Sequence, residues 1–155
     1  MPSSVKPIPD GFHSVTPYLV VEGVPKLITF LEQAFDANEI ERIPGPDGAV
    51  AHAEVRIGDS IVMMGSPRGE TKAMPTTLYL YVTDIDATYT RALAAGGVSI
   101  SEPTDQFYGD RTGAVRDPGG NEWHIATHVE DVSKEQLTKR MQAFSQGAAA
   151  QGGEK

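Results

Sequence analysis

The sequence predicts an α+β fold made of two consecutive βαβββ modules followed by a C-terminal helix. Three observations lead to this prediction. The order strand, helix, strand, hairpin occurs twice along the 155 residues. Short sequence matches recur at one constant spacing, which is the signature of an internal repeat. Each unit ends in two strand-like segments joined by a tight glycine-containing turn, the usual signal of a β-hairpin.

The first module is expected between residues 15 and 66. Its helix is indicated by apolar side chains that recur at helical spacing from Val24 to Phe35, and its strands by β-branched and aromatic runs. A punctuated loop, rich in glycine and proline, follows the module. The predicted elements are a strand at 16–21, a helix at 24–35, a strand at 39–43 and a hairpin of 51–57 and 60–64.

The second module is expected between residues 76 and 130, in the same order. Its helix should end at Gly96-Gly97, because glycine readily adopts the backbone conformation that stops a helix. Asp117-Pro118-Gly119-Gly120 should form the final tight turn. The predicted elements are a strand at 77–83, a helix at 85–95, a strand at 98–101, a loop at 106–109 and a hairpin of 112–116 and 121–128.

The repeat has a single offset. Tyr18 aligns with Tyr79, since 79 − 18 = 61, and Gly58 aligns with Gly119, since 119 − 58 = 61. An offset that persists across a whole unit without insertion indicates two copies of one module.

The two ends of the chain are expected to lie outside the modules. Residues 1–14 contain three prolines and predict a loose arm. Ser133 and Gln136 have the spacing of a capping box and predict a helix from Ser133 to about Phe144. The glycine- and alanine-rich residues 147–155 predict a disordered tail.

Composition limits the classes of partner. A formal net charge of −8 argues against nucleic acid, whose phosphates require a basic surface. No apolar run is long enough to span a membrane, and no secretory signal is visible. The chain has no cysteine, which excludes disulfides and is consistent with a cytoplasmic protein. A hydrophobic content of 39% is sufficient for one core.

Two βαβββ modules and the turn Asp117-Pro118-Gly119-Gly120-Asn121-Glu122-Trp123-His124 resemble the vicinal oxygen chelate superfamily. This superfamily includes glyoxalase I, bleomycin-resistance proteins and extradiol dioxygenases. Residues 107–111 and 125–133 resemble its PhnB-like branch. The resemblance covers residues 14–135. It implies that each module forms a half-barrel, and that the pair, often within a homodimer, encloses a cavity.

The resemblance also locates the positions at which metal enzymes of this superfamily hold their ion. These positions are Thr16, Met63, Thr77 and His124 in this chain. Threonine hydroxyls are poor neutral ligands, and a methionine thioether prefers soft metals. No metal and no other cofactor is therefore expected at these positions, although zinc, nickel or iron remains the alternative.

Strand alternation predicts which side chains line the cavity. Trp123 should face the core. The rings and carboxylates of the predicted wall favour a flat aromatic or cationic organic ligand. Tyrosine is also common in strands for its β-propensity alone, and His52 and Glu122 could be solvated strand residues. The predicted ligand-binding residues are Tyr18, His52, Glu54, Met63, Tyr79, Tyr81, Glu122 and His124, with Phe107 and Tyr108 at the mouth.

Three functions remain open from the sequence. The first is a metal-free small-molecule binding protein of the bleomycin-resistance type, which would sequester a drug or natural product as a homodimer. The second is a lyase, isomerase or dioxygenase-like enzyme with a divalent metal at a rebuilt site of His52, Glu54, Glu122 and His124. The third is a metal-free enzyme that uses Glu54 or His124 as an acid or base.

Overall fold

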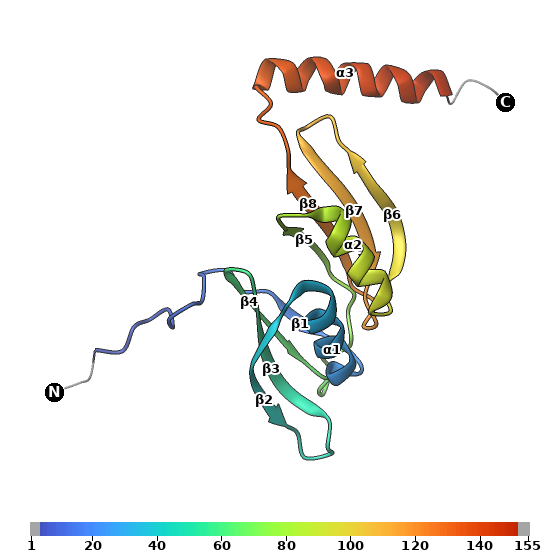
Figure 1. The fold of residues 1–155 in the computed structure, drawn as a ribbon. Helices are drawn as coiled ribbons and strands as arrows, with labels where there is room; N and C mark the ends of the chain where they lie inside the picture. Colours follow the sequence, from blue (N-terminus) through green and yellow to red (C-terminus); the bar gives the residue numbers. More distant parts are fainter. Residues whose placement is uncertain (1–3, 152–155) are drawn as a thin grey trace.

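The computed structural model describes residues 4–151, with side chains up to residue 147 (Figure 1). The first module consists of β1 (Tyr18–Val20), α1 (Val24–Phe35), β2 (Asn38–Pro44), β3 (Val50–Ile57) and β4 (Ser60–Gly65). The second consists of β5 (Thr77–Tyr81), α2 (Ile85–Ala94), β6 (Val98–Asp105), β7 (Asp110–Arg116) and β8 (Glu122–His128). A last helix, α3 (Lys134–Gln151), follows. The predicted α+β fold of two βαβββ modules is confirmed.

The two sheets have the same topology. Their strand orders are β1-β4-β3-β2 and β5-β8-β7-β6, and in each sheet the first strand pairs in parallel with the last. The parallel registers also match, because Tyr18 pairs with Met63 and Tyr79 pairs with His124. Both residues of the second pair lie 61 positions after those of the first, since 79 − 18 = 61 and 124 − 63 = 61. The repeat seen in the sequence is therefore a repeat of strand register.

The two modules share one hydrophobic core on the helical faces of their sheets. Leu27, Ile28 and Leu31 of α1 are fully buried, as their helical spacing predicts. Phe35 of α1 contacts Trp123 of β8, with ring centroids 5.0 Å apart, so this contact joins the modules. Trp123 is 2% exposed, which confirms its predicted place in the core. Burying a large apolar side chain contributes about 1.5–3 kcal/mol to stability.

The turn between β7 and β8 is organised by the carboxylate of Asp117. Its Oδ1 accepts hydrogen bonds from the backbone N–H groups of Gly119 (2.8 Å) and Asn121 (3.0 Å). Its Oδ2 accepts from Asn121 Nδ2 (3.0 Å) and from the indole Nε1 of Trp123 (2.8 Å). Asp117 and Asn121 are both buried. The motif that indicates the family is thus a structural element, because it fixes the turn and anchors the core tryptophan.

Some boundaries differ from the prediction. β6 extends to Asp105 instead of residue 101, because bulges between Ser99 and Thr104 interrupt the alternation by which a strand is recognised.

Helix α3 starts with the predicted cap, since Gln136 N donates to Ser133 Oγ at 3.2 Å. The helix continues past Phe144 to Gln151, so the prediction of disorder is wrong for 147–151, where alanine favours helix. Residues 152–155 lie outside the described part of the chain.

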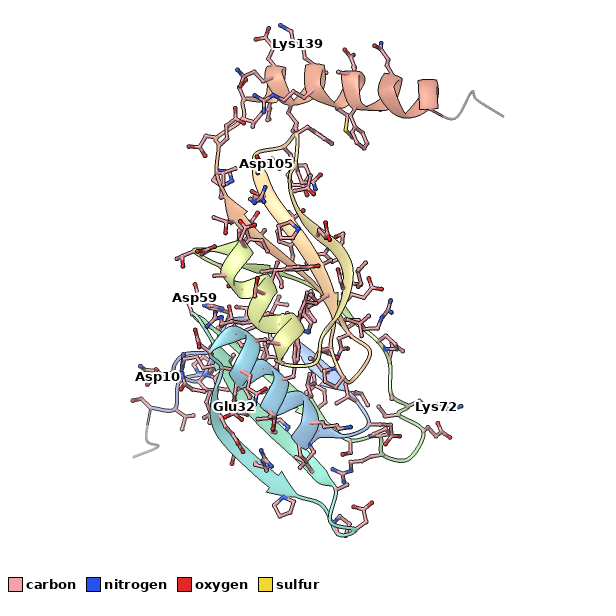
Figure 2. The ribbon with its side chains drawn as sticks, turned by 45° about the vertical axis from the view of Figure 1, so that its right-hand side comes forward. Asp10, Glu32, Asp59, Lys72, Asp105 and Lys139 are labelled. Carbon is pink, nitrogen blue, oxygen red and sulfur yellow. The ribbon has the colours of Figure 1, made fainter. Side chains whose placement is uncertain are left out.

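The N-terminal arm and α3 lie at different places on the molecule. Described residues 4–17 contain no helix or strand, and Gly11 of the arm lies against Arg56 and Ile61 of the first sheet. Helix α3 crosses one end of the second sheet, near Asp105, and its Lys139 points away from the sheet (Figures 1 and 2). None of the helices in the described part of the chain is long and apolar enough to span a membrane.

Candidate functional site

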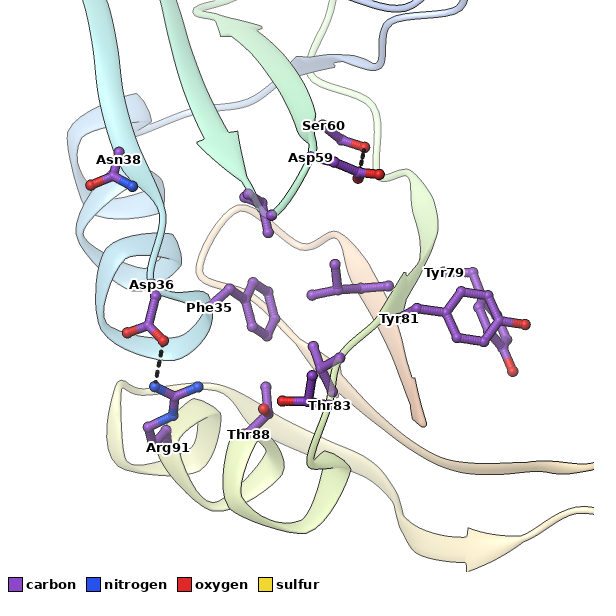
Figure 3. Close-up of a pocket in the computed structure, with 14 residues that line it drawn as sticks. Phe35, Asp36, Asn38, Asp59, Ser60, Tyr79, Tyr81, Thr83, Thr88 and Arg91 are labelled. Carbon is purple, nitrogen blue, oxygen red and sulfur yellow. Dashed lines mark hydrogen bonds and ion pairs between the residues drawn. The ribbon is translucent and has the colours of Figure 1, made fainter. Parts of the chain in front are cut away.

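The face of the second sheet that lies away from the helices carries exposed aromatic side chains. Alternation along β5 turns Leu78 and Leu80 toward the core and leaves Tyr79 45% and Tyr81 61% exposed. Figure 3 shows the two tyrosines projecting away from Phe35, which belongs to the core side of the strand. The structure thus places both tyrosines on the open face, as the sequence predicts.

These tyrosines form an aromatic cluster with their neighbours. The ring centroids of Tyr79 and Tyr81 are 5.2 Å apart. The rings of Tyr79 and His124 are parallel, with an angle of 3° between their planes and 6.4 Å between their centroids. Tyr108 lies close enough to Tyr79 to raise the pKa of that phenol, and it packs edge-on against Phe107 at 5.3 Å. Such an array of ring faces suits flat or cationic organic groups.

A buried carboxylate lies under the aromatic cluster. Asp110 is 4% exposed, and its Oδ2 accepts hydrogen bonds from the hydroxyls of Tyr79 (2.7 Å) and Tyr81 (2.9 Å). Its Oδ1 is bonded to Nδ1 of His128 at 2.8 Å, and Nε2 of His128 is bonded to Asp131 at 2.8 Å. Asp110 begins β7 and His128 ends β8, where the two residues pair across the sheet. We call these five residues the Asp110 network.

The pKa values of the network shift in a consistent way. Burial opposes ionisation of Asp110, but hydrogen bonds from His128, Tyr79 and Tyr81 outweigh burial and hold its pKa below the usual value. The bonds to Asp110 and Asp131 raise the pKa of His128. Burial, and then the bond to Asp110, raises the pKa of Tyr79. Near neutral pH the network therefore contains a carboxylate at Asp110 and phenols that keep their protons.

The raised pKa of His128 predicts a pH-dependent stability. A basic group whose pKa is higher in the folded state stabilises the fold fully below its unfolded pKa, near 6.5, and this stabilisation is lost as the pH rises through the folded value. We expect urea unfolding to show decreasing stability from pH 6.5 upward. The His128→Asn variant should lack this slope. An equal slope in both proteins would contradict the assignment of His128 as the titrating group.

The loop that carries Phe107 and Tyr108 is attached to α3. Arg140 of α3 donates to the carbonyl oxygen of Phe107 (3.2 Å) and forms a bidentate pair with Glu130 (2.7 and 2.9 Å). Phe144 contacts the ring of Phe107, with centroids 5.3 Å apart. The predicted mouth residues are thus held at the edge of the aromatic cluster by the C-terminal helix.

Gly109→Ala is expected to displace the loop that carries Phe107 and Tyr108 and to lower the free energy of unfolding by about 2–3 kcal/mol. Gly109 has a φ of 100°, and an added Cβ would overlap the carbonyl oxygen of Glu130. Gly58→Ala is the matched control, since Gly58 also has a positive φ (58°) but no atom within 4 Å of the added Cβ. Urea unfolding measures both variants. Equal losses would contradict the clash with Glu130.

The first sheet carries a second and smaller group of predicted site residues. The rings of Tyr18 and His52 are 5.8 Å apart, His52 Nε2 lies 3.0 Å from Glu54 Oε1, and Glu54 pairs with Met63 across β3 and β4. A pocket of about 370 Å³ lies between Glu54, Met63 and residues 7–16 of the arm. The arm therefore forms one wall of a cavity on the first module.

A larger open pocket, of about 700 Å³, lies where the two modules meet (Figure 3). It runs along β5, the edge strand of the second sheet, opposite the turn between β3 and β4. Asp36 and Arg91 form an ion pair of 2.9 Å on its wall. Tyr79 and Tyr81 also line this pocket, on the side formed by β5.

The structure separates residues that the sequence placed in one cavity. Glu54 and His124, the candidate catalytic residues, lie on different sheets, and Glu122 forms an ion pair with Arg116 (3.2 Å). Among the described residues, the one group of three metal-ligating side chains with ligand atoms within 4.8 Å consists of Glu41, His52 and Glu54. His52, Glu54, Glu122 and His124 therefore do not form one group of ligands within the described part of one chain.

The residues at the family's metal positions do not fit a divalent ion. Thr16 and Met63 belong to the first module and Thr77 and His124 to the second, and the hydroxyl of Thr16 donates to the carbonyl oxygen of His13 at 3.0 Å. Two hydroxyls, a thioether and one imidazole are a poor donor set for zinc, nickel or iron.

Three residues near the candidate sites, Asp110, His128 and Glu41, were not predicted from the sequence. Asp110 does not pair with its sequence neighbour Arg111, which pairs with Asp86 (2.9 Å) and Asp105 (3.2 Å). His128 lies in the segment 125–133 that resembles the PhnB-like branch, but that resemblance gave it no role. Glu41 faces Glu54 because a bulge shifts the register of β2. Alternation along β7 and β8 could have placed Asp110 and His128 together, if the hairpin register had been counted outward from the turn.

The sequence matches the family model of the Glyoxalase/Bleomycin resistance protein/Dioxygenase superfamily over residues 11–125. The chain belongs to this superfamily. The resemblance seen in the sequence is confirmed. An uncharacterized protein from Mycobacterium bovis is 37% identical over 145 residues, which cover 86% of this chain and 95% of the relative.

Several solved structures have a similar fold. TioX from Micromonospora sp. ML1 has a TM-score of 0.65 at 23% identity, over 76% of this chain and 99% of TioX. TnmS3 from Streptomyces sp. CB03234, described as an antibiotic binding protein, has a TM-score of 0.60 at 17% identity, over 81% of this chain and 98% of TnmS3. A PhnB protein from Bacillus cereus also matches, with a TM-score of 0.58 at 16% identity, over 74% of this chain and 99% of that protein.

Proposed function

We propose that this superfamily member binds small organic ligands without a metal ion, and that it sequesters a drug or natural product in the cytoplasm. The observation that carries the proposal is the exposed aromatic cluster of Tyr79, Tyr81 and His124 over the Asp110 carboxylate. Ring faces attract flat and cationic groups, and a nearby negative charge strengthens the attraction for cations. The fold shared with TnmS3, an antibiotic binding protein, supports this function.

The donor set and the contacts of the side chains present support a site without a metal ion. The family's metal positions hold Thr16, Met63 and Thr77 beside a single imidazole, His124. That imidazole lies parallel to the ring of Tyr79, an arrangement that serves aromatic contact. Binding by ring contact and hydrogen bonding needs no Lewis acid.

We also propose that a second copy of the chain completes the cavity. Tyr18, Tyr79 and Tyr81 are 48%, 45% and 61% exposed, on two open sheet faces that do not face a common cavity in one chain. A homodimer would cover these faces, as the family resemblance implies. Sedimentation equilibrium should give a dimer at micromolar concentration. A monomer at 100 times that concentration would contradict this part of the proposal.

Calorimetric titration of chelator-treated protein tests the binding function. The probes are bleomycin, a cationic glycopeptide, and N-methylacridinium, a planar aromatic cation without hydrogen-bond donors. We expect saturable binding of at least one probe, with a dissociation constant in the micromolar range, about −8 kcal/mol. The absence of saturable binding of both probes would contradict the proposal.

One observation favours a metal-dependent enzyme as a second candidate. Glu41, His52 and Glu54 could supply two carboxylates and one imidazole to a divalent ion. Equilibrium dialysis with zinc and nickel, followed by elemental analysis, tests this candidate against the His52→Ala variant. About one metal ion per chain in the native protein and none in the variant would favour the metal enzyme. No bound metal in either protein would reject it.

A further inference from the structure

We infer that the Tyr79–Tyr81 pair, oriented by Asp110 and His128, selects ligands that present N–H or O–H donors. This inference rests on the proposed binding function and names the chemistry that the aromatic cluster prefers. Two phenols on β5 share one buried carboxylate oxygen from β7, and the other oxygen of that carboxylate is held by an imidazole from β8. The three strands thus fix the direction in which both phenols point their hydrogens.

The hydrogen bonds to Asp110 determine which groups the two phenols can bind. An ionised carboxylate has only acceptor sites, so every neighbour of Asp110 must donate to it. Each phenol has one hydrogen, and both hydrogens point to Asp110 Oδ2, at O–O distances of 2.7 Å for Tyr79 and 2.9 Å for Tyr81. The phenol oxygens therefore present only lone pairs to a ligand on the open face. An incoming donor is satisfied there, whereas an incoming acceptor meets other acceptors.

The orientation of the phenol hydrogens is held in place by the neighbours of Asp110. Asp110 is 4% exposed, and its backbone oxygen accepts from Gln106 N at 2.7 Å. His128 lies between two carboxylates, at 2.8 Å from each, so both ring nitrogens donate when the ring is protonated. The pKa shifts of Asp110 and His128 support this charge assignment. A reversal of the phenol hydrogens would leave the buried Asp110 oxygen without two of its donors, which is unfavourable.

The charge beneath the phenols also selects among ligands. His128 lies between the carboxylates of Asp110 and Asp131 and, when protonated, balances one of their two negative charges, so this group of three keeps a net negative charge in either state of the imidazole. A cationic donor such as an ammonium or amidinium group is therefore favoured, and a carboxylate is disfavoured. Tyr79 and Tyr81 remain exposed enough for a ligand to reach their oxygens. The expected ligands are flat ring systems that carry N–H or O–H groups.

Two neutral rings of the same shape separate donor preference from charge. Indole has one N–H donor, and benzoxazole has only acceptors. We expect the wild-type protein to bind indole about tenfold more tightly than benzoxazole, measured by chemical-shift titration of the isotope-labelled protein. The shifts should change at residues 79 and 81.

The Asp110→Asn variant should reverse this preference. His128 needs an acceptor, so the amide oxygen at position 110 should face His128 and the amide NH₂ should face the tyrosines. The NH₂ group would then donate to the phenol oxygens, and the phenol hydrogens would turn toward the ligand. Asp105→Asn is the matched control, since Asp105 is exposed and pairs with Arg111. It should retain the preference for indole.

A second variant keeps the inference testable if Asp110→Asn does not fold. Tyr79→Phe/Tyr81→Phe retains both rings and removes both oxygens, so it should bind indole and benzoxazole equally. Equal binding of the two probes by the wild type, or an unchanged preference for indole in a folded variant, would overturn the inference and leave the binding function intact. If the wild type binds neither indole nor benzoxazole, the inference is overturned, and the titrations with bleomycin and N-methylacridinium decide the binding function separately.

Discussion

The Asp117→Ala variant should lose about 4 kcal/mol of its free energy of unfolding. The Asp117 carboxylate accepts hydrogen bonds from two backbone N–H groups and from the buried side chains of Asn121 and Trp123. Each buried donor that loses its partner costs about 1–3 kcal/mol, and the four losses overlap because they share one turn. Urea unfolding at neutral pH measures the change, and a melting temperature lower by about 10 °C should accompany it.

Asp47→Ala is the matched control for this prediction. Asp47 also lies in a hairpin turn, but it is exposed and accepts one hydrogen bond, from Ala49 N at 3.2 Å. Its loss should be below about 1 kcal/mol. If Asp117→Ala costs no more than Asp47→Ala, the turn does not depend on the Asp117 carboxylate as proposed.

Removal of the Tyr79 and Tyr81 rings should weaken the binding of planar cations. The double variant Tyr79→Ala/Tyr81→Ala should bind N-methylacridinium about 10- to 100-fold more weakly than the wild type, because two ring faces that attract a planar cation are removed. Fluorescence titration of the probe gives both dissociation constants. Circular dichroism should show unchanged secondary structure, since the two rings lie on the open face of the sheet.

Tyr79→Phe/Tyr81→Phe separates the rings from their hydroxyls. This probe has no donor for the phenol oxygens, so the phenylalanine variant should bind it within about threefold of the wild type. A loss in the phenylalanine variant as large as in the alanine variant would show that the hydroxyls and the Asp110 network, instead of the ring faces, carry the binding of planar cations.

Most of the fold was predictable because its signals are local and repeated. The spacing of Leu27, Ile28 and Leu31 indicates α1, and the glycines at 58 and 119 mark equivalent hairpins 61 residues apart. The longer β6 was missed because bulges break the period of two. The longer α3 was missed because composition near the C-terminus suggested disorder, whereas alanine also favours helix.

The site was predictable only in part. Alternation correctly placed Tyr79, Tyr81 and His124 on one face, since a strand turns every second side chain the same way. The Asp110 network was missed because it joins β5, β7 and β8, and its bond between Tyr79 and Asp110 spans 31 residues of sequence. The separation of Glu54 from His124 depends on how the two modules pack, which no local pattern encodes.

Chemical-shift mapping of N-methylacridinium on chelator-treated protein tests the central proposal most directly. We predict saturable changes at residues 79, 81, 108 and 124, with the same affinity before and after metal removal. Saturable changes confined to residues 41, 52 and 54, or binding that depends on added zinc or nickel, would contradict a metal-free aromatic site on the second module.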